Sequence, residues 1–368
     1  MKSLFKKYGL SQGHLWGLGL FIFFGLAHSF IANEDYIICF EKELNAAGIS
    51  ECQSGIPALI PYSHSTLDKD NRSVGPFDEQ KVSSLYYRHW LGTDVIGRDV
   101  LAGLLAGSAI ALKIGLFSVL LSLILGSFLG YLSGYIGDDG FKLPRGLMIS
   151  YLLVLTIAAF YFYYGSTLAR VGTLVLVLAV TLWATKKSSS YPRDKKQVAL
   201  PLDLIVMRVI EVFRSIPTLF VLLVLLGIVR TPTLGSIIII IALLRWPSIT
   251  RYLRAEILKL KEAQFVKSAQ ALGLSRFRVF WDHILPLSLS PVIVASSFAV
   301  STAILLESTL SFLGLGLTVD QVSWGSILNN ARTNFDHWWL AFFPGLLIYL
   351  VIYLFNSIGD GLSNRLRA

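Results

Sequence analysis

The sequence carries little charge for its length. Only 15% of its 368 residues are Asp, Glu, Lys or Arg, whereas 54% are hydrophobic. A typical soluble domain has about 25% charged residues, so this chain has too few polar side chains to cover a water-soluble globule. The excess apolar residues are expected to face lipid, and the sequence predicts an all-α integral membrane protein.

Motifs for nucleotide, metal and nucleophilic chemistry are missing. No Gly-x4-Gly-Lys-Ser/Thr run is present to hold phosphates, so any ATP that drives this protein would be bound by another subunit. The six histidines are dispersed without ligand spacing, and there is no His-Glu-x-x-His, Cys-x-x-Cys or Gly-x-Ser-x-Gly run. We expect no catalytic residue, no metal site and no cofactor bound by this chain.

Cysteine is scarce, and the two that occur are Cys39 and Cys52. Both lie in a segment that we place outside the membrane, where an oxidising compartment permits a disulfide. A bridge between them and a pair of unlinked thiols are both compatible with the sequence.

Long charge-free runs predict the membrane spans. Five runs are near or above the roughly 18 residues that cross the hydrocarbon layer: 15–33, 114–137, 146–169, 284–306 and 337–359. Shorter runs at 171–185, 215–229 and 231–244 can span if flanking Lys and Arg side chains reach the interfaces. The sequence therefore predicts about eight transmembrane helices. The first is long and aromatic without a clear cleavage site, so we expect it to be retained as an anchor.

The distribution of charge predicts the orientation. If the N-terminus is cytoplasmic, eight crossings return the C-terminus to the cytoplasm, and the clusters of Lys and Arg fall on the cytoplasmic side. The external segment between the first two spans carries eleven acidic and six basic residues. The formal net charge of +9 then reflects membrane topology. Membrane lipid is an expected partner, and nucleic acid is not.

The chain divides into five regions. They are a cytoplasmic N-terminus with the first anchor (1–33), an external loop-rich cap and entrance segment (34–105), the second transmembrane helix (106–137), a transmembrane hairpin with a basic cytoplasmic linker (141–200), and a core (202–368) that contains a cytoplasmic loop at 251–286. The cap is rich in turn-forming residues and has a weak helical pattern only around residues 41–47. In the second span, Gly126, Gly130 and Gly134 recur every four residues, which favours close helix packing over a pore-lining role.

The cytoplasmic segment at 245–286 is too long and too regular to be a plain connector. Its first part, residues 263–272, predicts a short helix with Phe265, Ala269 and Leu272 on one face. Gly273 is placed to end this helix in a left-handed conformation.

A second short helix is predicted at 276–284. Ser275 can accept amide hydrogen bonds at its start, and Pro286 is expected to separate it from the next span. The two helices either offer an apolar stripe to a soluble partner or lie on the membrane surface.

Residues 251–286, RYLRAEILKLKEAQFVKSAQALGLSRFRVFWDHILP, resemble the cytoplasmic signature of ABC importer permeases. Gly273, Leu285 and Pro286 match that signature. Its Glu-Ala-Ala corresponds here to Lys267, Ser268 and Ala269, so an ion pair made by the acid would be lost or reversed.

Further stretches are similar to the dipeptide, oligopeptide and nickel branch of these permeases. They are HWLGTDVIGRDVLAGLLAG, ESTLSFLGLGL, SWGSIL and FFPGLLIYLVIYLFNSIGDGLSNRLR. The resemblance covers about residues 89–137 and 202–367. It implies a six-span core into which the hairpin at 146–185 is inserted.

The resemblance implies the permease subunit of a bacterial ABC importer in the cytoplasmic membrane, translocating short peptides or related solutes. Its expected partners are a homologous second permease subunit, two ATP-binding subunits that use ATP and Mg, and an external solute-binding protein. The ATPase-coupling residues would be Phe265, Val266, Lys267, Ser268, Ala269, Leu272, Gly273, Ser275, Leu285 and Pro286. The alternative is an ATP-independent secondary transporter or channel, which ordinarily shows ionisable residues at related positions of two repeats.

Two other groups of residues are candidates for the solute route. Glu307 interrupts an apolar span. It either lines the route or has a structural role, in which it accepts hydrogen bonds from the region of Ser308, Thr309 and Ser311 or pairs with a partner chain. The Gly-Thr-Asp and Gly-Arg-Asp runs would fix the external entrance by ion pairing, although loop structure alone also explains them. Their residues are Gly92, Thr93, Asp94, Gly97, Arg98 and Asp99. Arg208 and Glu211, three residues apart, predict a helix-surface ion pair.

Overall fold

The computed structural model describes residues 12–34, 38–44, 50–138, 140, 142–144, 156, 172–173, 179, 197–229, 232–318, 321–333 and 336–367. The chain forms two compact units, residues 1–130 with 213–368 and residues 131–212. The predicted hairpin at 146–185 lies almost wholly outside the described residues and stays a prediction.

The described residues are mainly helical, which confirms the all-α membrane fold. Four helices are long and apolar enough to cross a membrane, and a fifth span is counted if α6 and α7 are joined. The bounds of the long helices are α2 Gln12–Ile31, α3 Val100–Tyr131, α8 Leu234–Lys261, α11 Leu285–Phe312 and α13 Trp339–Arg367. The apolar part of α2, Trp16–Ile31, is shorter than these candidate spans. The count of eight spans is therefore not confirmed.

The strands among the described residues form two short antiparallel sheets. β1 (Ile38–Leu44) pairs with β2 (Ser50–Ile56), and β3 (Lys142–Pro144) pairs with β4 (Gln197–Ala199). The weak helical pattern around residues 41–47 was misleading, because the described part of that segment is a strand. Pairing with β2 supplies the backbone hydrogen bonds that a short isolated helix would have formed within itself.

Helices α6 (Leu202–Ser215) and α7 (Thr218–Ile228) are separated at Pro217. Proline lacks the amide N–H that a continuing helix needs, and it restricts the residue before it, so the chain breaks here. On α6, Arg208 Nη1 lies 2.7 Å from Glu211 Oε2, and both side chains are exposed. The predicted ion pair is confirmed.

Helix α8 is longer than the sequence predicts. The sequence places the end of this span at Leu244 and a loop from Arg245 onward, whereas the helix continues to Lys261. Ile249, Leu253 and Ile257 recur every four residues and are all buried, so the packed face extends past the charged positions. The prediction of a loop from 245 was wrong for this physical reason.

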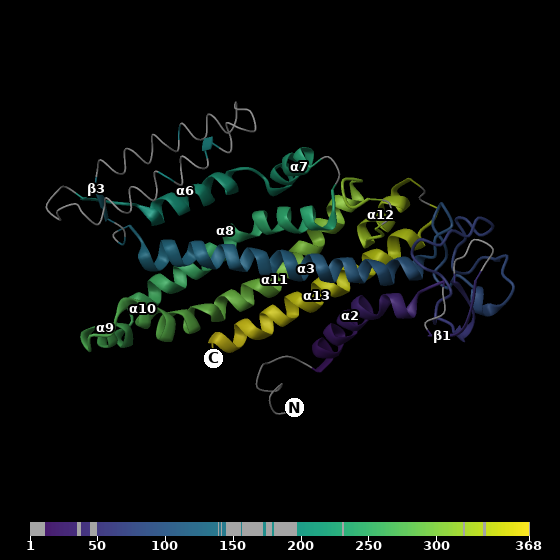
Figure 1. The fold of residues 1–368 in the computed structure, drawn as a ribbon, viewed down its shortest axis with the longest axis horizontal. Helices are drawn as coiled ribbons and strands as arrows, with labels where there is room; N and C mark the ends of the chain where they lie inside the picture. Colours follow the sequence, from purple (N-terminus) through teal and green to yellow (C-terminus); the bar gives the residue numbers. More distant parts are fainter. Residues whose placement is uncertain are drawn as a thin grey trace. The chain divides into compact units, whose positions relative to one another are not determined.

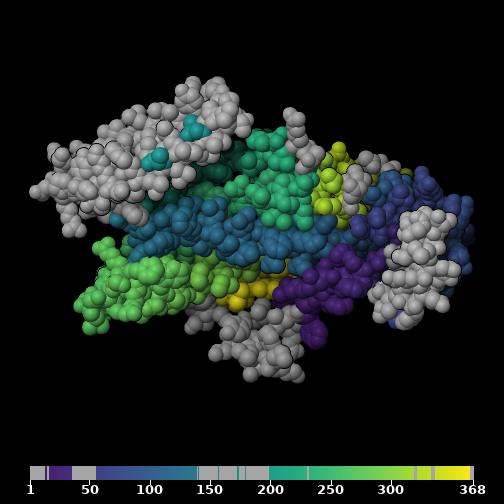
Figure 2. All heavy atoms as spheres, viewed as in Figure 1, coloured from purple at the N-terminus to yellow at the C-terminus, as the bar shows by residue number. Residues whose placement is uncertain are grey.

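Small residues let α3 and α8 approach closely. A Cβ atom on Gly126 would lie 2.8 Å from Cβ of Ile249, and one on Gly130 would lie 3.0 Å from Cβ of Leu253. The hydroxyl of Thr250 also donates to the carbonyl of Gly126 at 3.1 Å. For these two glycines, the packing interpretation is confirmed. Figure 2 shows α3 in blue beside α2 in purple, where Gly25 meets Leu112.

Helix α11 forms the centre of the larger unit. It packs against α8, α13 and the short helix α12 (Trp324–Thr333), and Ala303 and Ile304 at these contacts are fully buried. The indole N–H of Trp324 donates to the carbonyl of Leu104 in α3 at 2.9 Å. Figure 1 shows α11 and α13 running side by side.

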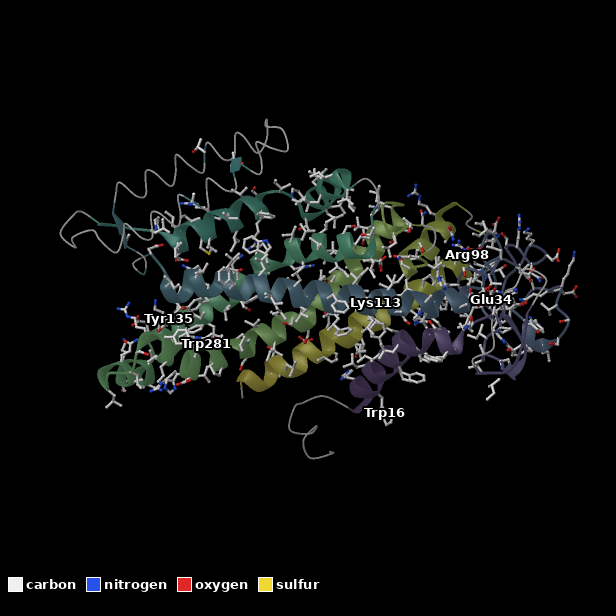
Figure 3. All side chains as sticks on the ribbon, in the orientation of Figure 1. Trp16, Glu34, Arg98, Lys113, Tyr135 and Trp281 are labelled. Atoms are coloured by element: carbon white, nitrogen blue, oxygen red, sulfur yellow. The ribbon has the colours of Figure 1, made fainter. Side chains whose placement is uncertain are left out.

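The larger unit has two chemically different ends. Figure 1 shows the segment containing β1 at one end of its helices, close to α12, and α9 and α10 at the other. In Figure 3, Arg98 and Trp281 mark these opposite ends. The candidate functional residues from the sequence fall at both.

Candidate functional site

Helix α9 (Gln264–Ala271) forms where the first cytoplasmic helix was predicted. The turn that follows it contains Gly273, whose φ of +84° is in the left-handed region that glycine adopts without strain. The amides of Gly273 and Leu274 donate to the carbonyls of Gln270 and Ala269, at 3.0 and 3.2 Å. This paired arrangement satisfies the last carbonyls of the helix and turns the chain sharply.

The apolar residues of α9 divide between two faces. Val266 and Ala269 are buried, whereas Phe265 is 43% exposed and Leu272 is 84% exposed. The sequence placed Ala269 on the same face as Phe265 and Leu272. It lies instead at the edge that faces inward, because α9 contacts both α8 and α10.

Helix α10 (Arg276–Val279) begins where the second cytoplasmic helix was predicted. The hydroxyl of Ser275 accepts a hydrogen bond from the amide of Arg278 at 3.3 Å, which confirms the predicted cap. A π-helical turn, Phe280–Ile284, then leads directly into α11.

Pro286 does not separate this helix from the next span. Residues Arg276–Phe312 form one continuous helix that is long enough to cross a membrane. Proline has no N–H to donate to the carbonyl four residues earlier, and the widened turn just before it accommodates that missing bond. The expectation of a break at Pro286 was wrong.

The exposed apolar side chains of α9, α10 and the following turn form what we call the α9–α10 surface. It consists of Phe265, Leu272, Phe277 and Trp281, and the last two are 67% and 51% exposed. The rings of Phe277 and Trp281 contact each other, with centroids 5.9 Å apart. The sequence interpretation missed these two residues, although their spacing of four places them on one helix face.

Lys267 occupies the position where the related signature has an acid. Its Nζ lies 2.9 Å from Oε2 of Glu262, and both side chains are exposed. The hydrogen bond and the charge of Lys267 hold the pKa of Glu262 below its usual value. The positive charge of Lys267 is therefore paired with Glu262, five residues earlier in the chain.

At the opposite end, the entrance residues form a hydrogen-bonded loop. Gly92 and Gly97 have φ values of +79° and +93°, so both positions favour glycine. The hydroxyl of Thr93 donates to the carbonyl of Asn71 at 2.6 Å and accepts from the amide of Val74 at 3.0 Å.

The carboxylates of the entrance residues accept backbone hydrogen bonds. Asp94 Oδ1 accepts from the amides of Ile96 and Arg98, each at 2.9 Å. Asp99 Oδ1 accepts from the amide of Ala102 at 2.7 Å, which caps the start of α3. These contacts support the loop-structure explanation of the two Asp residues.

A cavity of about 220 Å³ lies beside this loop. Asp94, Arg98 and Asp99 line one side, and the end of α11, the loop after it and α12 line the other. The polar residues on that second side are Ser311, Thr318, Gln321, Ser326, Asn329 and Asn330. The loop residues were predicted as site candidates from the sequence, whereas the polar residues of α12 were not.

Glu307 in α11 is buried, at 1% exposure. Its Oε1 accepts from the hydroxyl of Ser311 at 2.7 Å, and its Oε2 accepts from that of Ser308 at 3.4 Å. Ser311 also lines the cavity, so it joins the buried carboxylate to the polar space. The hydrogen-bonding role that the sequence allowed is therefore present.

The cysteines lie on the β1–β2 hairpin. Cys39 is opposite Gly55 and Cys52 is opposite Lys42 in the strand register. Their side chains lie outside the described residues, so the disulfide stays a prediction. Among the described residues, no group of three or more His, Cys, Asp or Glu side chains is placed to hold a metal ion.

Comparison with known proteins identifies the family of this chain. Residues 199–368 match the family described as "Binding-protein-dependent transport system inner membrane component". The dipeptide transport system permease protein DppC of Alkalihalophilus pseudofirmus is 28% identical over 84% of this chain and 79% of its own length. The glutathione transport system permease protein GsiD of Pectobacterium atrosepticum has the same identity and coverage. A peptide permease protein of Brucella suis is 30% identical, again over 84% and 79%. The chain belongs to the family of inner membrane components of binding-protein-dependent transport systems.

Proposed function

We propose that this chain is the permease subunit of a bacterial ABC importer that moves short peptides across the cytoplasmic membrane. The observation that carries the proposal is the α9–α10 surface, an apolar patch on a short helix pair directly connected to two long apolar helices. The names of the related dipeptide, glutathione and peptide permeases support the substrate class.

The geometry supports mechanical coupling. Helix α8 ends at Lys261, α9 follows after two residues, and the helix that begins at Arg276 continues through the next span without a break. A partner that grips α9 therefore pulls on two long helices at once. Movement of α9 by partner ATPases would shift these helices between inward-open and outward-open arrangements. The partner ATPases would supply ATP and Mg, and this chain would bind neither.

The external cavity supports a solute route that passes the entrance residues. Charges of both signs line it, at Asp94 and Arg98, together with side-chain amides at Asn329 and Asn330. This lining suits the ammonium, carboxylate and amide groups of a short peptide. Glu307 contributes through Ser311, which it holds in place at the cavity wall.

The complete importer in this proposal contains a homologous second permease subunit, two ATP-binding subunits and an external solute-binding protein. The α9–α10 surface would lie in the cytoplasm, as would both chain termini. The loop segment at 50–99 would face the solute-binding protein.

Purification from native membranes in a mild detergent tests this proposal. We expect the chain to retain an ATP-binding subunit and a second permease, and the purified complex to hydrolyse ATP. Retention of the second permease without any ATP-binding subunit, from membranes that still take up peptides through this chain, would favour a secondary transporter. Replacing Phe265 by Asp should release the ATP-binding subunit while leaving the second permease bound.

A further inference from the structure

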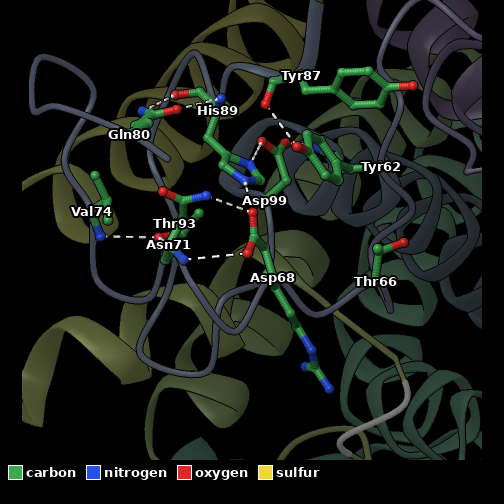
Figure 4. Close-up of polar contacts among 12 residues, drawn as sticks. Tyr62, Thr66, Asp68, Asn71, Val74, Gln80, Tyr87, His89, Thr93 and Asp99 are labelled. Atoms are coloured by element: carbon green, nitrogen blue, oxygen red, sulfur yellow. Dashed lines mark hydrogen bonds and ion pairs between the residues drawn. The ribbon is translucent and has the colours of Figure 1, made fainter. Parts of the chain in front are cut away.

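His89 lies between two carboxylates in the external segment. Its Nδ1 is 2.8 Å from Oδ2 of Asp99, and its Nε2 is 3.3 Å from Oδ2 of Asp68. The side chain of His89 has no exposed surface. Figure 4 shows the imidazole ring between the two acids.

This geometry requires a particular protonation state. A neutral imidazole carries one N–H, so one of its two nitrogens would direct a lone pair at a carboxylate oxygen. An imidazolium donates from both nitrogens and satisfies both contacts. We propose that charged His89 is a pH-responsive clamp that fastens the external segment to the start of α3, and that the segment loosens when His89 loses its proton.

The surroundings hold the ring in place. The ring of Tyr62 stacks on that of His89 with centroids 4.2 Å apart. Gln80 accepts from the amide of His89 at 2.8 Å and donates to its carbonyl at 3.0 Å. Because the backbone and one ring face are fixed, loss of the proton cannot be relieved by simple rotation of the side chain away from either acid.

Both carboxylates are themselves anchored. Asp68 accepts from the side-chain amide of Asn71 at 2.7 Å and from the backbone amide of Asp70 at 3.0 Å. Asp99 caps α3 through the amide of Ala102. The imidazolium therefore joins a turn at residues 68–71 to the first turn of a long apolar helix.

The pKa shifts agree with this clamp. Burial alone would lower the pKa of His89, but hydrogen bonds and charges from Asp99 and Asp68 outweigh it and raise the pKa above 6.5. Burial raises the pKa of Asp68, but hydrogen bonds from Asn71, His89 and two backbone amides lower it overall, below 3.8. Burial, followed by the charges of Asp68 and Asp99, raises the pKa of Tyr62 to about 12.

The sign of the pH dependence follows. A histidine whose pKa is higher in the folded protein contributes its full stabilisation below its unfolded pKa, and loses it as the pH rises through the folded pKa. An aspartate whose pKa is lower in the folded protein contributes its full stabilisation above its unfolded pKa. It loses this stabilisation as the pH falls through its folded pKa. The clamp is therefore fully closed between about pH 4 and pH 6.5 and opens on the alkaline side.

Hydrogen–deuterium exchange of the full chain in lipid nanodiscs tests the clamp. Protection factors would be measured for peptides covering residues 62–99 from about pH 6 to about pH 9, corrected for intrinsic exchange. Wild-type protection should fall about tenfold with a single midpoint above 6.5, and a tenfold change corresponds to about 1.4 kcal/mol. His89→Gln should show low protection throughout and no midpoint.

Asp68→Asn supplies a second test that keeps the histidine and its contact with Asp99. Its midpoint should move to lower pH because one of the two carboxylates that favour the charged ring is gone. His337→Gln, a histidine whose ring contacts Trp339, should keep the wild-type midpoint. A flat wild-type profile, an unchanged midpoint in His89→Gln, or a uniform loss of protection without a shift in Asp68→Asn would overturn the proposal.

Discussion

The two ends of the larger unit differ in which side chains they bury and which they expose. The end that carries the entrance residues turns polar groups inward, and Asn71, His89 and Thr93 are buried and hydrogen-bonded to neighbours within the same segment. The end that carries α9 and α10 turns large apolar groups outward at the α9–α10 surface. The hydrogen bonds of Asn71, His89 and Thr93 are made within the chain.

The difference indicates where a partner is required. Exposed apolar side chains grouped on a short helix pair lose their contact with water when another protein or the membrane surface covers them. A loop whose buried polar groups are paired gains less from such cover. We therefore place the tightly bound energy-supplying partner on the α9–α10 surface, and expect external partners to bind a segment that is already folded.

The largest effect is expected from Phe265→Asp. This change puts a charge into the apolar contact, where burial without a partner costs about 2 kcal/mol or more. Peptide uptake and its stimulation of ATP hydrolysis should both be lost, while membrane insertion and thermal stability in detergent stay unchanged. Phe265→Leu is the matched control and should keep most of the uptake. Normal uptake by Phe265→Asp would show that this surface does not couple to a partner.

A smaller effect is expected when the glycines with positive φ at the two ends, Gly97 and Gly273, are replaced by alanine. At Gly97 an added Cβ would collide with the backbone carbonyl of Asp68, whereas at Gly273 nothing lies within 4 Å. Gly273→Ala should cost only the conformational strain of about 1–2 kcal/mol. Gly97→Ala adds the collision and should lower the melting temperature in detergent considerably more. Equal losses for the two variants would contradict the contrast between a crowded and an open end.

The smallest effect is expected from Lys267→Glu. The variant replaces an exposed ion pair with two neighbouring acids, and exposed pairs contribute little to stability. The melting temperature should change by no more than the scatter of the measurement. The binding of ATPase subunits reports whether the charge at this position also matters to the partner. A large loss of stability would mean that the pair holds α9 in place.

The sequence predicted α9 and α10 well because the signals for their ends are local. Gly273 predicts the end of one helix and Ser275 the start of the next. Gly273 has a positive φ and Ser275 caps α10, as expected. The length of α8 was missed because Arg245 and the charges after it were taken to end a span. The buried series Ile249, Leu253 and Ile257 shows that a helix continues past charge when one face still packs.

The end that carries the entrance residues was less predictable because its contacts join residues that are distant in the sequence. Asp68 and His89 are 21 residues apart, and the indole of Trp339 donates to the carbonyl of Thr93 across 246 residues. No periodic pattern identifies such pairs. The Gly-Thr-Asp and Gly-Arg-Asp runs do form a hydrogen-bonded loop, since their glycines adopt positive φ values and their acids accept backbone hydrogen bonds.

The source of energy is the most direct test of the central claim. The chain would be placed in liposomes either alone or with its second permease, its ATP-binding subunits and its solute-binding protein, and uptake of a labelled dipeptide would be followed. Accumulation against the concentration gradient should occur only in the complete assembly supplied with ATP. Accumulation by the chain alone, driven by a proton or sodium gradient, would contradict the account.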